Sequence, residues 1–387
     1  MTEIRGITWD HPRGVLPLRA ASDQYAQDKG VTVSWAARPL CSFEDTPVSE
    51  LAESFDLLAI DHPSIGDASR AGALLPFEDF LSDSQLEDRA RDAAGASHSS
   101  YQREGKQWAL AFDAACMVSA FRSDKIDVAT VPAEWSELTA LSKSLGRERV
   151  LIAANPTHLF CTFLSLCEVV SPVRFRQADG RPAWWTDDGI AADVAEAAIE
   201  MLREVLDACS IDSLNSDPIT VLDRLCSEEI VYVPLVFGYV TYSLKRANLA
   251  PVTFIDAPGT GGDRIGTLTG GVGLAVSAHS RQPAAAADFA RFATEKSIQC
   301  GLLASAGGQP ARASAWLSSD VNEAAGNFFS NTLRTLDLSF VRPRAVGYPR
   351  FQSEAGAALH SMFIRGSGSA GIVRELSALW GQLVAVR

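Results

Sequence analysis

The pattern of apolar and polar positions in the first part of the chain alternates between strand-like runs and helical spacing. The predicted elements follow in the order strand, helix, strand, helix, strand at residues 3–10, 18–30, 31–40, 48–55 and 56–68. Gly30 ends the first helical pattern, which predicts a C-terminal cap there. This β-α-β-α-β order predicts a parallel sheet covered by helices, and therefore an α/β fold.

The pattern changes near Phe112 and Asp113, where two strand-like runs flank this pair of residues. A second α/β unit follows, with a strand predicted in RERVLIAAN and another reaching Phe237, Gly238 and Tyr239. Helices are predicted between and beside these strands at residues 131–145, 157–170, 193–209 and 217–228. Glycine-rich turns, one more strand, an Ala-rich helix and a mostly helical C-terminal part complete the chain.

Length and composition narrow the class of protein. The chain has 387 residues, which suits two domains better than one. Hydrophobic residues make up 47% and charged residues 21%, as in ordinary soluble proteins, and no run approaches the ~18 apolar residues of a membrane-spanning helix. The net charge of −13, without a basic stripe, argues against nucleic acid as a partner. The sequence thus predicts neither nucleic-acid binding nor membrane insertion.

Motifs for cofactors and metals are missing from the sequence. GTGGDRIG and GTLTGGVG are glycine-rich, but neither ends in the Gly-Lys-Ser/Thr of a phosphate loop. We find no H-E-x-x-H, no zinc-type set of cysteine and histidine, no EF-hand loop and no G-x-S-x-G elbow. The sequence therefore predicts no cofactor and no metal.

Two Asp-His pairs stand directly after predicted strands and before a proline. They are Asp10-His11 and Asp61-His62. In an open α/β sheet the ligand crevice lies at the carboxyl ends of the strands, so both pairs face one crevice if their strands are parallel neighbours. Three interpretations stay open: ordinary turn chemistry, polar contacts to a ligand, and acid–base or metal chemistry.

Several later blocks, in their order and spacing, resemble the extracellular solute-binding proteins, which are the carbohydrate-type receptors of ABC importers. The resemblance covers nearly the whole chain and rests on these blocks: FDLLAIDHPSIGDASRAGALLPFEDFL, GKQWALAFDAACMVSAFRSDKI, VPAEWSEL, GTLTGGVGLAVSAHSRQPAAAADFARFAT and GGQPARASAWL. No single block is as specific as a metal signature, so the order of the blocks carries the resemblance.

The resemblance implies a periplasmic-binding-protein-like fold of two α/β lobes with the ligand cleft between them. By analogy, one lobe comprises residues 1–112 and 257–298, and the other comprises residues 113–256 and 299–387. The implied function is to capture a small polar ligand, a sugar or a small carboxylate, by hinge closure of the lobes. If the protein is exported, the implied partner is the permease of an ABC importer.

The resemblance also implies which positions face the cleft. The predicted ligand-binding residues are Trp9, Asp10, His11, Asp61, His62, Asp113, Phe237, Tyr239, Gly270, Gly271, Tyr348 and Arg350. Aromatic faces stack on sugar rings, carboxylates accept hydrogen bonds from hydroxyls, and glycines let the backbone approach the ligand. Arg342 and Arg350 would instead suit a carboxylate ligand.

A second hypothesis is a cytoplasmic enzyme built on the same fold. In it, His11, Asp61 and His62 act as general acid and base. We favour binding without turnover, because the sequence shows no combination of nucleophile and base.

The cellular location follows from two features of the sequence. No signal peptide precedes the first predicted strand, and the seven cysteines are odd in number with no C-x-x-C pair. Both features predict a cytoplasmic protein, unless a leader has been removed, in which case the location is periplasmic or extracellular.

Overall fold

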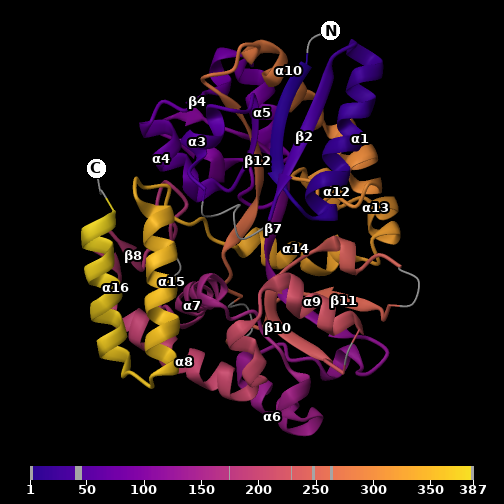
Figure 1. Ribbon diagram of the computed structural model, residues 1–387. Coiled ribbons are helices and arrows are strands. Elements are labelled where there is room, and N and C mark those ends of the chain that lie inside the picture. The colour runs from indigo at the N-terminus through magenta and orange to yellow at the C-terminus, as the bar shows by residue number, and fades with distance from the viewer. Residues whose placement is uncertain are drawn as a thin grey trace.

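A computed structural model describes residues 3–39, 46–173, 175–227, 229–245, 249–261 and 265–384. The chain folds into two α/β lobes that are joined through the long strand β7 (Figure 1). The strands are β1 (Glu3–Trp9), β2 (Thr32–Arg38), β3 (Leu57–Ile60), β4 (Leu74–Leu75), β5 (Gln102–Arg103), β6 (Lys106–Gln107), β7 (Leu110–Arg122), β8 (Trp185–Thr186), β9 (Gly189–Ile190), β10 (Tyr232–Phe237), β11 (Val252–Ile255) and β12 (Thr269–Ser277).

The helices cover both lobes, and short 3₁₀ and π segments lie between them. They are α1 (Pro12–Lys29), α3 (Val48–Ala52), α4 (Ile65–Arg70), α5 (Asp83–Arg91), α6 (Leu138–Leu145), α7 (Pro156–Val170), α8 (Ala192–Ala208), α9 (Pro218–Ser227), α10 (Pro283–Ala293), α11 (Lys296–Ile298), α12 (Ala313–Trp316), α13 (Ser319–Ala324), α14 (Phe328–Leu338), α15 (Tyr348–Ile364) and α16 (Ser369–Leu383).

The predicted parallel sheet of the first lobe is confirmed. The strand order is β10-β7-β12-β3-β1-β2, and β1 pairs in parallel with both β2 and β3. The loops after β1 and β3 therefore leave the sheet at the same edge, which is the condition under which the two Asp-His pairs face one crevice. Gly30 ends α1 in the left-handed conformation with φ 68°, so the predicted cap is also confirmed.

The strand β7 crosses from one lobe to the other. Its first half pairs with β12, and its second half pairs with β10 and β11. Two separate strands were predicted around Asp113, and that prediction is wrong because the single strand β7 continues through this residue, with a shift of its register to β12 beside it. A buried carboxylate in the middle of an apolar run suggests a break in the sequence, but here an arginine from α1 binds it.

The prediction of a strand in RERVLIAAN is also wrong. Arg147–Arg149 form an exposed 3₁₀ turn, and residues 150–154 are buried and make one isolated bridge, between Val150 and Tyr232. Beyond this bridge, amide groups donate to a 3₁₀ turn instead of a strand: Ile152 N–H donates to Ser213 Oγ at 3.2 Å, and Ala154 N–H donates to the Ser213 carbonyl at 3.1 Å. An apolar run predicts burial, but it does not specify which groups accept the hydrogen bonds from its backbone amides.

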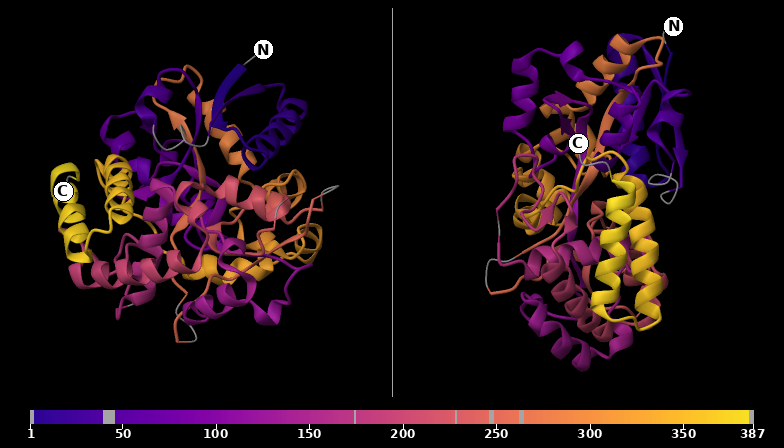
Figure 2. Two further views of the ribbon diagram at one scale, coloured as in Figure 1. Left: turned by 60° about the horizontal axis from the view of Figure 1, so that its bottom comes forward. Right: turned by 90° about the vertical axis from the view of Figure 1, so that its left-hand side faces the viewer.

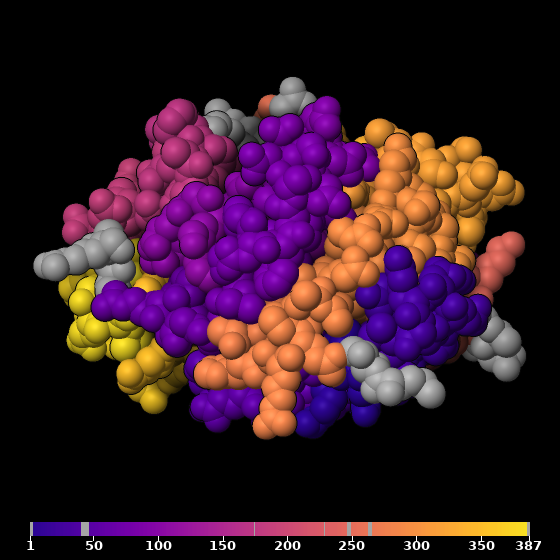
Figure 3. Space-filling model, turned by 90° about the horizontal axis from the view of Figure 1, so that it is seen from above, coloured from indigo at the N-terminus to yellow at the C-terminus, as the bar shows by residue number. Residues whose placement is uncertain are grey.

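Each lobe has cores on both faces of its strands. In β3, Leu57 and Ala59 pack with α1 and α10, whereas Leu58 and Ile60 pack with α3 and α4. Seen from above, α10 and its neighbouring orange segment lie between the indigo N-terminal segment and the purple segment that follows it (Figure 3). The first lobe is thus built from parts of the chain that are far apart in sequence.

The second lobe is centred on α7, an apolar helix that packs against α8 and α15. The two C-terminal helices α15 and α16 lie side by side along one flank of the molecule (Figure 2). This packing brings the start of α15 next to the loop after β3 of the first lobe, which is where the chain forms a cavity.

Candidate functional site

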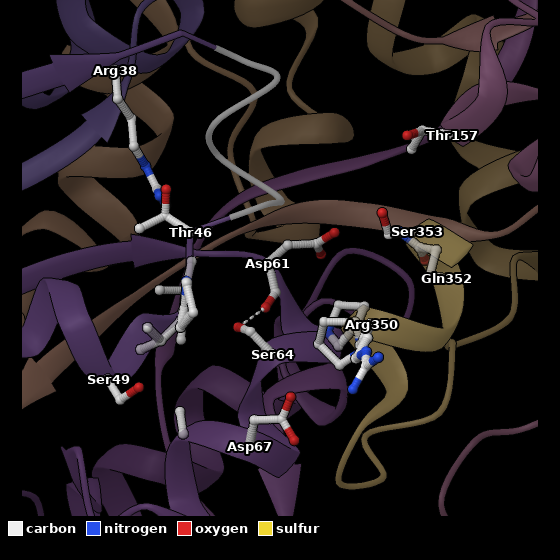
Figure 4. A pocket seen from close by; sticks show the side chains of 16 residues that line it. Arg38, Thr46, Ser49, Asp61, Ser64, Asp67, Thr157, Arg350, Gln352 and Ser353 are labelled. Carbon is white, nitrogen blue, oxygen red and sulfur yellow. Dashed lines mark hydrogen bonds between the residues drawn. The ribbon is translucent and has the colours of Figure 1, made fainter. Parts of the chain in front are cut away.

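A cavity of about 550 Å³ lies between the two lobes. The first lobe contributes the end of β2, the start of α3, the loop after β3 and α4, while the second lobe contributes Thr157 of α7 and the first turn of α15 (Figure 4). The lining residues are Arg38, Thr46, Pro47, Val48, Ser49, Ile60, Asp61, Pro63, Ser64, Asp67, Ala68, Thr157, Pro349, Arg350, Gln352 and Ser353.

The loop after β3 is held by its own hydrogen bonds. Asp61 caps a 3₁₀ turn, and its Oδ1 accepts from the backbone N–H of His62 at 2.8 Å. Ser64 Oγ donates to the backbone carbonyl of Asp61 at 2.6 Å, a bond drawn in Figure 4. This turn fixes the Asp61 carboxylate at the edge of the sheet, facing the cavity.

The opposite wall is fixed by the start of α15. Gly347 precedes this helix with φ 85°, in the left-handed region, and Pro349 stands in the first turn of the helix. The backbone N–H of Gly347 donates to Asp67 Oδ1 of α4 at 2.6 Å. Asp67, which lines the cavity from the first lobe, thereby fixes the start of α15 in the opposite wall.

Arg342 connects the two walls beneath the cavity. Its Nη2 donates to Asp61 Oδ2 at 2.5 Å, and its Nη1 donates to Gln352 Oε1 at 2.9 Å. Burial alone would raise the pKa of Asp61, but Arg342 and, to a smaller extent, His62 outweigh it and hold that pKa well below its usual range. The Asp61 carboxylate is therefore ionised at any physiological pH.

Asp61 and Arg350 are the predicted site residues that line this cavity. His62 follows Asp61 but is fully buried beside Tyr101, with ring centroids 6.3 Å apart. Asp10 follows β1 at the same edge and is exposed. That Asp10, Asp61, His62 and Arg350 contact a ligand remains a prediction.

A second group of predicted residues lies on the side of α1. His11 caps α1, its Nδ1 accepting from the Arg13 N–H at 3.1 Å. Its ring contacts Tyr239 edge-on at 4.8 Å and stacks on Tyr242 at 6.3 Å. These contacts join the first lobe to the second, because both tyrosines follow β10.

Asp113 is the partner of an arginine that the sequence analysis did not select. Arg13 binds both oxygens of the Asp113 carboxylate, and its Nη1 donates to the Gly238 carbonyl at 2.9 Å. The Arg13 guanidinium also lies over the Tyr239 ring, 4.6 Å from its centroid. Since Asp113 is 1% exposed, its carboxylate binds protein.

The other predicted residues pack against protein. Trp9 is buried against Gly14, and Tyr348 is buried next to Trp185. A Cβ at Gly270 would meet the Phe237 ring, and one at Gly271, with φ 122°, would meet the Asp113 carbonyl. The close backbone approach predicted for the two glycines is therefore an approach to neighbouring protein groups.

Most of the lining residues were not predicted from the sequence. The hydroxyl groups, Asp67 and the Gln352 amide lie in loops and short or first helical turns, and Arg38 ends β2; none of these positions has a distinctive spacing in the sequence. One local signal was available: Asn155-Pro156 predicts the start of α7, where Asn155 Oδ1 accepts from the His158 N–H at 3.0 Å and so places Thr157 at the cavity.

The cavity offers hydroxyls, carboxylates and guanidinium groups together with small apolar side chains. Burial lowers the pKa of Arg38 to about 10, so this guanidinium stays charged near neutral pH. None of the described lining residues is aromatic. No group of three or more His, Cys, Asp or Glu side chains in the described part of the chain could hold a metal ion. This lining suits a small ligand that donates and accepts many hydrogen bonds.

Buried histidines predict a loss of stability in mild acid. Burial lowers the pKa of His62, His98 and His158 to about 4 each, below the ordinary value of about 6.5. The unfolded chain takes up these protons as the pH falls through 6.5, whereas the folded protein does so only near 4. The free energy of unfolding should therefore fall by about 1 kcal/mol per histidine between pH 7 and 5.5.

The variant His158→Gln checks this prediction through urea unfolding at both pH values. His158 titrates in the fields of Asp217, which raises its pKa, and Arg342, which lowers it, but burial dominates. We expect the variant to lose about 1 kcal/mol less than the wild type between the two pH values. Equal losses in both proteins would show that His158 is not held neutral by the fold.

Three solved structures have folds similar to that of this chain. The maltose-bound MalE3 of T. maritima has a TM-score of 0.79 and 17% identity, covering 99% of this chain and 100% of that chain. An ABC transporter solute-binding protein from Agrobacterium radiobacter K84, in complex with ribitol, has a TM-score of 0.75, 18% identity and 98% coverage of both chains. One from Thermotoga lettingae TMO, bound with α-D-tagatose, has a TM-score of 0.79, 11% identity and 99% coverage of both chains.

The family follows from a sequence model. The model described as bacterial extracellular solute-binding protein matches residues 20–329, which is most of the chain. The chain therefore belongs to this family, as the resemblance in the sequence implied, and proteins of this family normally act in the periplasm or outside the cell. A comparison with curated protein sequences gave no match. No helix in the described ranges is long and apolar enough to span a membrane.

Proposed function

We propose that this protein captures a small polyhydroxylated solute, a sugar or a sugar alcohol, in the cavity between its lobes. The observation that carries the proposal is the lining of that cavity, in which hydroxyls and the ionised Asp61 are arranged on facing walls of two lobes. Hydroxyl groups of such a solute can donate to carboxylates and accept from guanidinium groups and hydroxyls. The fold neighbours with bound maltose, ribitol and α-D-tagatose support the same class of ligand.

A small carboxylate is the alternative ligand. Arg38 and Arg350 lie on opposite walls of the cavity, and guanidinium groups bind carboxylates well (Figure 4). Asp61 and Asp67 oppose this choice, because they place two negative charges in the same space. We therefore rank the neutral polyhydroxylated ligand first.

We infer that ligand binding closes the lobes about the segments that cross between them. The lobes we propose are residues 1–112 with 257–298 and residues 113–256 with 299–387. Packing supports one adjustment. Leu303 belongs to the core formed by α1, β12 and α10, so the boundary between residues 298 and 299 moves to a position after Leu303. Polar contacts between walls, such as Asp67 with Gly347, are of the kind that hinge closure can remake.

The experiment is a titration of the purified protein with a panel of sugars, sugar alcohols and small carboxylates, which includes D-glucose, sorbitol and ribitol. A ligand present at 100 times its dissociation constant should add about 2.7 kcal/mol to the free energy of unfolding. Ser353 is exposed on α15 and lines the cavity, so the variant Ser353→Arg should fill the cavity and weaken binding at least about tenfold.

The matched control is Ile364→Arg, which adds the same side chain at the far end of α15, where Ile364 is 60% exposed. It should bind as the wild type does. Equal effects of both variants, or no effect of Ser353→Arg, would place the ligand outside this cavity. If no compound of a broad panel binds the folded protein, the proposed function is wrong.

We further propose that the bound solute is delivered to the permease of an ABC importer, outside the cytoplasm. The cysteines gave the main reason to expect a cytoplasmic protein. Five of the six described cysteines are buried, and Cys41 lies outside the described residues. Buried thiols are protected from oxidation, so they do not oppose export. Fractionation of cells that express the native gene tests the location, and recovery in the cytoplasm would contradict this proposal.

We do not propose catalysis. Of the three candidate acid–base groups, His11 contacts tyrosines beside α1, His62 is fully buried, and Asp61 is held by Arg342. They do not form a pair of groups facing one bound substrate, and the turnover hypothesis has no other support in the described residues.

A further inference from the structure

Residues 339–347, a segment of the second lobe that lies against the first lobe, are attached at several points. This segment joins α14 to α15. The Phe340 N–H donates to the Thr267 carbonyl at 2.9 Å, and the Thr269 N–H donates to the Phe340 carbonyl at 2.7 Å. Arg103 Nε of the first lobe donates to the Arg344 carbonyl at 3.1 Å. The backbone on both sides of Arg342 is therefore fixed.

The Arg342 side chain has little freedom either. It is 1% exposed, and its guanidinium reaches Asp61 in one wall of the cavity and Gln352 in the other. Both partners line the cavity, whereas Arg342 itself does not. A planar guanidinium with two donors directed at two acceptors sets the distance between them, which a lysine ammonium on a flexible stem does not do.

We propose that Arg342 is the positioning residue of the ligand site: its guanidinium holds Asp61 and Gln352 at a fixed separation, with Asp61 as an ionised acceptor for ligand hydroxyls. This inference rests on the proposed function for the identity of the ligand. It goes further in assigning the geometry of the acceptor to a residue that lies behind the cavity wall.

The electrostatic setting makes the inference testable without any ligand. The groups around Asp61 are His62, Tyr101, Arg342, Arg344 and, around the cavity, Arg38, Asp67 and Arg350. Burial pushes the pKa of Asp61 upwards, and Arg342 is the largest opposing influence. Without Arg342, burial should prevail, and Asp61 should take up a proton as the pH is lowered from 8 to 4.

The first experiment follows the carboxylate carbon of Asp61 by NMR in the ligand-free protein, with ¹³C-labelled aspartate and the signal assigned through Asp61→Asn. In the wild type this signal should not titrate between pH 8 and 4. In Arg342→Gln it should titrate within that range, and in the control Arg365→Gln, an exposed position at the end of α15, it should not. A signal that titrates in the wild type, or fails to titrate in Arg342→Gln, overturns the inference.

A second variant separates charge from position and also covers the case in which Arg342→Gln does not fold. Arg342→Lys keeps the positive charge, so Asp61 should stay ionised, but one ammonium cannot hold both walls. Calorimetric titration with D-glucose and sorbitol should show about tenfold weaker binding than the wild type, with the effect reproduced by Gln352→Met. Wild-type affinity in both variants would overturn the positioning role.

The two proposals fail in different ways. If the wild type binds neither D-glucose nor sorbitol nor any other compound of the panel, the proposed function fails, while the NMR titration still decides the role of Arg342 on Asp61. If sugars bind but the Asp61 signal of the wild type titrates between pH 8 and 4, the function stands and the inference about Arg342 is wrong.

Discussion

Replacing Arg13 by methionine should lower the free energy of unfolding by about 3–5 kcal/mol, the loss typical of a broken buried ion pair. Arg13 is 4% exposed and Asp113 is 1% exposed, so water cannot replace the lost partner. The pKa of Asp113 is raised by burial, and Arg13 only partly offsets this. In Arg13→Met the carboxyl should therefore be protonated at neutral pH, and urea unfolding should show the loss.

A double variant gives this prediction its sharpest check. Arg13→Met combined with Asp113→Leu removes both charges, and apolar replacement of a whole buried pair is often neutral. The double variant should therefore be more stable than Arg13→Met alone. Arg19→Met, at an exposed position on the same helix, should change the stability by less than about 0.5 kcal/mol. A single variant as stable as this control would show that the pair is not buried as described.

Replacing Gly347 by alanine should cost about 3 kcal/mol of unfolding free energy. Gly347 has φ 85°, which an alanine adopts at a cost of roughly 1–2 kcal/mol. A Cβ at this position would also overlap the carbonyl oxygen of Leu383 at the end of α16, and such overpacking adds about 1–3 kcal/mol. Since Gly347 precedes the helix turn that lines the cavity, ligand affinity should fall as well.

Gly366 offers a matched control for this substitution. It follows the same helix with φ 70°, but nothing lies within 4 Å of the Cβ that an alanine would add. Gly366→Ala should therefore show only the backbone cost, about 1 kcal/mol. If both variants lose the same stability in thermal unfolding, the overlap with α16 does not exist in solution, and the wall of the cavity is less tightly held than described.

The candidate site illustrates what one sequence can predict. Asp61 was predicted because it follows a buried strand in a parallel sheet, and such positions meet at one edge. Arg350 was predicted from the family resemblance. The aromatic side chains were predicted as ligand contacts, but Trp9 and Tyr348 are buried in protein, because the same large apolar ring serves a core and a sugar platform equally well. Local sequence does not distinguish these two environments.

The sequence by itself determined the α/β class, the parallel start of the sheet, the cap at Gly30 and the family, since these depend on local periodicity and on motifs in a fixed order. The tertiary structure decided which distant side chains meet. Asp61 and Arg342 are 281 positions apart in the chain, and Arg13 and Asp113 are 100 apart. No local pattern encodes such pairs, because each charge is placed by the packing of a different helix or strand. It is the low-dielectric interior that makes their contact strong.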